Sequence, residues 1–158
     1  MNVALWYLER FGGTRERVRR SLEKRVREAA QVHGPNPDAM QWIEAVLDEL
    51  ESLGYINDEA FATSCVIRGQ RQGKSQGLII QDLRRAGVST DVRAKVLSHF
   101  VDAQPDFELQ AAQLYVRSRS IGPYRADPQA FYQKDMARLA RRGFSYDIAR
   151  EALEKMKS

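Results

Sequence analysis

The stretch closest to a chemical motif is Gly69-Gln70-Arg71-Gln72-Gly73-Lys74-Ser75, which has the glycines, lysine and serine of a phosphate-binding loop. Such a loop has four residues between its glycines and follows a strand, so that its backbone N–H groups surround the phosphates. Here three residues separate the glycines, and the stretch follows a predicted helix. We therefore interpret it as a helix end and restart that presents basic side chains to a partner: Arg68, Arg71 and Lys74.

Other chemistry has little support in the sequence. His33 and His99 are far apart, and neither has cysteine or carboxylate neighbours at the spacing of metal ligands. The carboxylates of residues 38–59 have no nucleophile or base beside them in the pattern. We predict no catalytic, cofactor-binding or metal site, and a protein that is not an enzyme.

Basic residues are the remaining candidates for function. Arg84-Arg85 and Arg141-Arg142 lie in the last turn before a glycine in two copies of a repeated pattern, with Arg85 and Arg141 at the same position. Cations at helix C-termini bind phosphates regardless of the nucleotide sequence. They also interact favourably with the helix dipole when the turn is simply exposed to solvent. Both interpretations fit any single arginine, and repetition in register favours binding. The hypothesis is a surface for DNA or a protein–DNA filament made by Arg68, Arg71, Lys74, Arg84, Arg85, Arg138, Arg141 and Arg142.

The repeated pattern predicts the corners that position these residues. In residues 83–91 and 139–147, a Leu precedes a Gly by four positions, and a Ser and then an Asp follow the Gly. Glycine ends a helix in the left-handed conformation, serine caps the next helix, and the acid favours its dipole. A weaker copy is predicted at residues 8–16. The unit is helix, tight corner, helix, as in a repeat array.

Helical spacing of apolar residues elsewhere, without alternating strand patterns, predicts an all-α protein. Two prolines and a glycine break the chain at residues 34–37. We predict an elongated array of tandem three-helix repeats: an incomplete module at 1–33, a three- or four-helix module at 38–102, and a three-helix module at 104–158. Trp6 and Trp42 are interpreted as packing anchors, and Cys65 as a buried structural thiol.

The charge pattern is segregated along the chain. The net charge is +4, but residues 1–28 sum to +4, residues 29–67 to −7 and residues 68–100 to +5. Such a surface favours a partner that is polyanionic or exposes both signs. The single cysteine and the absence of a secretory pattern or long apolar run predict a cytoplasmic protein away from the membrane. Monomer is the default expectation.

The block Gly54-Tyr55-Ile56-Asn57-Asp58-Glu59-Ala60-Phe61-Ala62 closely resembles the signature of the RecX family of bacterial regulators. An arginine-rich helix follows it, as in that family, and residues 83–89 and 139–145 resemble two further family segments. The resemblance covers nearly the whole chain. The chain departs from the family pattern in the first module and in the proline-containing linker.

The resemblance implies a function. RecX proteins are tandem three-helix repeats in a curved shape that bind RecA recombinase, lie along the RecA–DNA filament and usually inhibit it. It thus implies a partner in the RecA filament, weaker sequence-independent binding of single- or double-stranded DNA, and roles in homologous recombination, DNA repair and the SOS response. The alternative is a stand-alone DNA-binding protein of helix-turn-helix type, although the helices after Ser89 and Ser145 offer few base-reading side chains. A structural adaptor for another protein is a third possibility.

Overall fold

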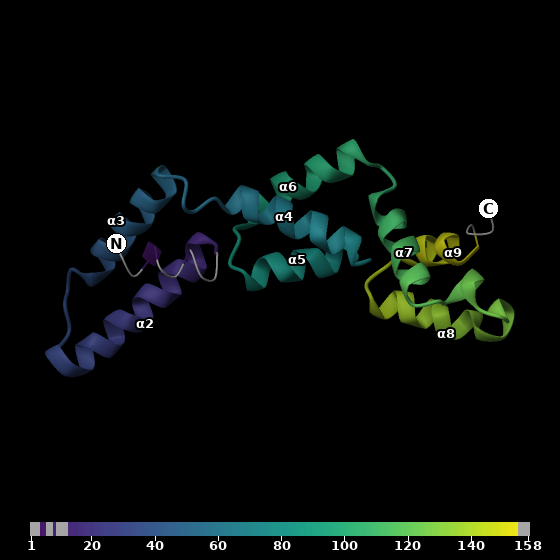
Figure 1. The fold of residues 1–158 in the computed structure, drawn as a ribbon, viewed down its shortest axis with the longest axis horizontal. Coiled ribbons are helices and arrows are strands. Elements are labelled where there is room, and N and C mark those ends of the chain that lie inside the picture. The colour runs from purple at the N-terminus through teal and green to yellow at the C-terminus, as the bar shows by residue number, and fades with distance from the viewer. Residues whose placement is uncertain (1–3, 6–7, 9–12, 155–158) are drawn as a thin grey trace.

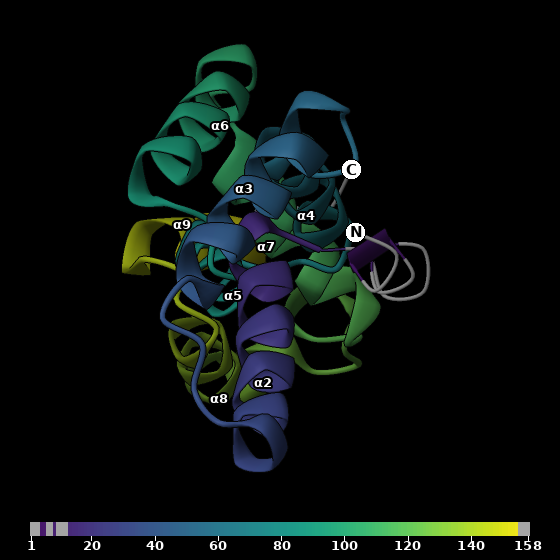
Figure 2. The ribbon, with the colours of Figure 1, turned by 90° about the vertical axis from the view of Figure 1, so that its left-hand side faces the viewer.

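The computed structural model describes residues 4–5, 8 and 13–154, and over this part of the chain it is all-α, as predicted. The helices are α2 (Arg15–His33), α3 (Ala39–Ser52), α4 (Asp58–Arg71), α5 (Gln76–Arg85), α6 (Thr90–Ala103), α7 (Phe107–Ser118), α8 (Pro128–Arg141) and α9 (Tyr146–Glu154), with a 3₁₀ turn η1 (Gly122–Tyr124). They form an elongated array with α2 and α3 at one end, α4–α6 in the middle and α7–α9 at the other end (Figure 1). Figure 2 looks along this array from the α2–α3 end, with the groups one behind another.

Three hydrophobic cores follow one another along the array. The middle core lies among α4, α5 and α6 and also takes in Phe107, the first residue of α7. The last core lies among α7, α8 and α9. The first core joins Val18 of α2 to α3 and to Ile56. The linker between α2 and α3 joins two helices of this core, because the apolar face of α3 is covered by α2.

The corners at residues 83–91 and 139–147 form as predicted. Gly87 and Gly143 have φ of 78° and 86°, in the left-handed region. Ser89 and Ser145 each accept a hydrogen bond of 3.3 Å from the backbone N–H three residues on. These bonds satisfy one of the unpaired donors at each helix start.

The third copy, at residues 8–16, is not equivalent. Thr14 does cap a helix, accepting from the amide of Arg17. That helix is α2, whose place in the array matches α5 rather than α6, so the residue that corresponds to Thr14 is Ser75. Short motifs of glycine and hydroxyl residues can occur at the start of any helix, which explains why Thr14 was aligned with the caps of the wrong helices. Residues 9–12 lie outside the described residues.

Two expectations about single side chains have different outcomes. Cys65 is buried, as predicted. Trp42 is 60% exposed and is not a packing anchor. It lies between α2 and α3, where it lines an open apolar groove with Leu22 and Val26. Trp6 lies outside the described residues.

Candidate binding surface

The array is held together by a contact that occurs twice. The buried Thr14 hydroxyl, at the start of α2, donates a hydrogen bond to the backbone carbonyl of Ala86, at the end of α5. The buried Ser75 hydroxyl, at the start of α5, donates to the carbonyl of Arg142, at the end of α8, over 2.6 Å. We call the Thr14 contact joint 1 and the Ser75 contact joint 2. At each joint one hydroxyl both caps a helix and binds the end of another.

A second hydrogen bond repeats beside the first. The amide of Arg15 donates to the Asp58 carboxylate over 2.9 Å, and the amide of Gln76 donates to the Glu108 carboxylate over 3.0 Å. Asp58 and Glu108 lie at the starts of α4 and α7. Burial raises the pKa of both carboxyls, and the backbone hydrogen bonds partly oppose this shift. A carboxylate at the start of a following helix therefore satisfies a helix-start donor that would otherwise be unpaired.

These joints arrange three helices head to tail. α8, α5 and α2 follow one another along the lower edge of the array in Figure 1, with the end of one against the start of the next. The negative end of each helix dipole thus meets the positive start of its neighbour. Arginines in the last turn of α5 and α8 are consequently placed at the joints.

The structure separates the predicted basic residues into two groups. Arg84 and Arg85, in the last turn of α5, are exposed at joint 1. The end of α4 and the end of α8 meet at joint 2. The predicted residues there are Arg68, Arg71, Lys74, Arg138, Arg141 and Arg142.

Two members of the joint 2 group have structural partners. Lys74 forms an ion pair of 2.6 Å with Asp82. The guanidinium of Arg142 stacks over the ring of Tyr115 at 4.7 Å, and its Nη2 lies 3.4 Å from the carbonyl oxygen of Gly73. Gly73 has φ of 62°, and a Cβ there would lie 2.7 Å from the backbone nitrogen of Tyr115. Arg142 therefore fastens α8 to the α4–α5 turn, a structural role that its place in the sequence does not distinguish from binding.

Joint 2 also contains a basic hollow. It has a volume of about 380 Å³ and is lined by Tyr115, Arg119, Arg138, Arg141 and Arg142. Arg119 ends α7, whereas the other arginines come from the end of α8. Arg119 and Tyr115 were not among the predicted residues, since their nearness to α8 depends on how α7 packs.

Basic residues of α2 form ion pairs with acidic residues of α3. Arg15 forms ion pairs of 2.9, 2.6 and 2.6 Å with Glu44, Asp48 and Glu51. Arg19 also binds Glu44, and these two guanidiniums lower the pKa of that carboxyl to about 2. Much of the acidic run of residues 38–59 is thus paired within the α2–α3 hairpin.

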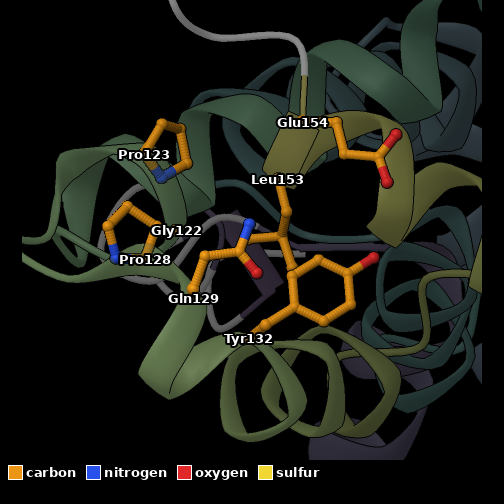
Figure 3. A pocket seen from close by; sticks show the side chains of 7 residues that line it. All are labelled: Gly122, Pro123, Pro128, Gln129, Tyr132, Leu153 and Glu154. Atoms are coloured by element: carbon orange, nitrogen blue, oxygen red, sulfur yellow. The ribbon is translucent and has the colours of Figure 1, made fainter.

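A larger pocket of about 530 Å³ lies at the other end of the last core, lined by η1, the start of α8 and the end of α9 (Figure 3). Its side chains include Tyr132, Gln129 and Glu154, and it contains no arginine. Nearby, the fully buried Asp135 holds η1 by accepting from the Gly122 amide and from Arg125, both over 2.8 Å. Hydrogen bonding from Arg125 and Gly122 outweighs burial and keeps the pKa of Asp135 low. This ion pair is structural.

Within the described residues, every helix falls short of the length and apolar character needed to span a membrane. No group of three or more His, Cys, Asp or Glu side chains among them is placed to hold a metal ion.

Comparison with known proteins gives the family. The chain is 35% identical over 158 residues to the regulatory protein RecX of Myxococcus xanthus, covering 97% of this chain and 83% of the relative. It is also 35% identical to the regulatory protein RecX of Corynebacterium efficiens, covering 93% and 75% of the two chains. The crystal structure of RecX from Lactobacillus salivarius shares the fold, with a TM-score of 0.73 at 22% identity, over 98% of this chain and 92% of that one. No protein-family model matches the chain. The identities and coverage confirm the resemblance found in the sequence: the chain belongs to the RecX family of regulatory proteins.

Proposed function

We propose that this protein binds the RecA–DNA filament and inhibits its recombinase, ATPase and coprotease activities, as a non-enzymatic monomer in the cytoplasm. Family membership supports the regulatory role. The observation that carries the binding mode is the repetition of the joint, which places exposed arginines at two positions along one elongated array. A filament repeats both its protein and its phosphates, so an array with repeated contacts can bind several equivalent sites at once.

The binding surface in this proposal comprises the unpaired arginines at the joints. Arg68 and Arg71 end α4, and Arg84 and Arg85 end α5; all four are exposed, and none forms an ion pair within the described part of the chain. Contacts of this kind contribute affinity that falls with salt and carries no sequence preference.

We further propose that the array divides into three modules, at the linkers before α4 and before α7 rather than before α3. The hydrophobic cores support this division.

The test is RecA's ATP hydrolysis on single-stranded DNA, with substoichiometric protein added after filaments have formed. Progressive loss of activity is expected. Reversing Arg68, Arg71, Arg84 and Arg85 to Glu should weaken inhibition steeply and leave helicity unchanged, because these side chains are exposed. The control reverses Lys24, Arg25 and Arg27, which lie on α2 away from the joints.

Unchanged inhibition by the quadruple variant would overturn the surface assignment. If the wild-type protein has no effect on ATP hydrolysis but binds bare duplex DNA tightly with sequence preference, the filament proposal fails. The helix-turn-helix alternative would then replace it.

A further inference from the structure

We propose that the hollow at joint 2 is a binding site for a backbone phosphodiester of a nucleic-acid strand, held by Arg119, Arg138 and Arg141. The proposal rests on the proposed function in one respect only, namely that a RecA filament would supply the strand. It names a specific pocket and includes Arg119, a residue for which no binding role follows from the sequence pattern.

The hollow gathers arginine side chains that the described part of the fold leaves without ion pairs. The side chains of Arg119, Arg138 and Arg141 form no ion pair or hydrogen bond within residues 13–154, although they line one hollow. The Asp135 carboxylate attracts Arg138 but is already paired with Arg125. Elsewhere the chain neutralises neighbouring cations, as Glu44 does for Arg15 and Arg19. Three guanidiniums around one hollow repel each other unless an anion joins them, since each pair of like charges costs energy that screening only partly removes.

Arg142 and Tyr115 also line the hollow. The Arg142 side chain is held against the Tyr115 ring, and its Nε is buried without a hydrogen-bond partner among the described residues. The Tyr115 ring and the Gly73 carbonyl thus hold the positive charge of Arg142 at the hollow. Arg119 lies 6.0 Å from the same ring. The tyrosine therefore orients two of the cations and limits the entropy they lose when an anion binds.

The guanidinium groups determine which type of anion fits the hollow. Guanidinium groups bind phosphate oxygens in a bidentate manner, and several guanidiniums converging from two helices suit a tetrahedral group with several acceptor oxygens. The exposed Arg71 lies two residues before Gly73, whose carbonyl is next to Arg142. Cations therefore continue from the hollow towards the end of α4, which suits the successive phosphates of a strand better than an isolated phosphate ion.

The experiment measures binding of a fluorescent single-stranded oligonucleotide to the full chain by anisotropy, over a range of salt concentrations. The variant carries Arg119→Gln and Arg141→Gln, because both side chains are exposed and both should be removable without unfolding. The matched control, Arg25→Gln with Arg27→Gln, removes the same charge from α2. The hollow variant should bind at least tenfold more weakly. Its log–log salt dependence should fall by about 0.7 for each charge lost from a phosphate contact, with the control close to wild type.

Further arms distinguish the outcomes. Pyrophosphate and inorganic phosphate are added as competitors. If either displaces the oligonucleotide at a concentration near the dissociation constant of the oligonucleotide, the site binds free phosphates, and the assignment to a nucleic-acid strand is overturned. Equal losses in the hollow variant and the α2 control would reduce the site to general charge attraction, which also overturns it. A wild-type protein that inhibits RecA without binding DNA refutes this inference alone. Binding through the hollow without any effect on RecA refutes the proposed function alone.

Discussion

Joint 2 gives the sharpest test of how the array is held together, through the single substitution Ser75→Ala. The buried Ser75 hydroxyl accepts from the amide of Leu78 at 3.3 Å and donates to the Arg142 carbonyl at 2.6 Å. Loss of the cap costs about 1 kcal/mol. The Arg142 carbonyl then loses its partner in a half-buried position, which costs a further 1–3 kcal/mol or so. The free energy of unfolding should fall by about 3 kcal/mol.

The matched control is Ser89→Ala. Ser89 caps α6 with the same geometry, 3.3 Å from the amide of Val92, but it is exposed and binds no other helix. Its loss should cost about 1 kcal/mol. In thermal unfolding followed by circular dichroism at 222 nm, Ser75→Ala should lower Tm by roughly 6–12 °C and Ser89→Ala by roughly 2–4 °C. Ser75→Thr should have a Tm close to that of the wild type, since Thr14 forms the equivalent hydrogen bonds at joint 1. Equal effects of the two alanine variants would refute the joint as a source of stability.

Two further predictions concern the α2–α3 hairpin and the turn at joint 2. Glu44→Gln should destabilise the α2–α3 hairpin at pH 7 by about 1 kcal/mol, because the Glu44 carboxylate is partly exposed and its ion pairs are partly screened. Its folded pKa of about 2 lies below the unfolded value of 4.5, so its contribution is complete above pH 4.5 and is lost as the pH falls towards 2. Urea unfolding at pH 7 and pH 2 should show the difference only at pH 7, and a difference that persists at pH 2 would contradict the assignment. Gly73→Ala should destabilise far more than Gly54→Ala: both glycines have positive φ, but a Cβ at Gly73 would meet the backbone of Tyr115, whereas nothing lies within 4 Å of one at Gly54. Similar Tm values for these two variants would show that joint 2 does not need the close approach.

The corners of the fold were predictable because they are local. A glycine at φ near 80° followed by a capping serine fixes a helix end and a helix start within a few residues, as at Gly87 and Ser89. The same locality explains the failure at Thr14. A capping hydroxyl identifies a helix start but does not say which helix of the array it begins.

The candidate site was predictable only in composition. The sequence alone determined that the chain is helical, that arginines end α4, α5 and α8, and that no catalytic pattern accompanies them. Tertiary structure decided which of these arginines are available. It pairs Lys74 with Asp82, uses Arg142 to fasten the joint, and brings Arg119 from α7 to the hollow. Helix ends depend on residues a few positions apart. By contrast, Arg142 contacts a carbonyl 69 positions away, and Arg119 reaches the hollow only when α7 packs in the last core, so both contacts exist only in the folded array.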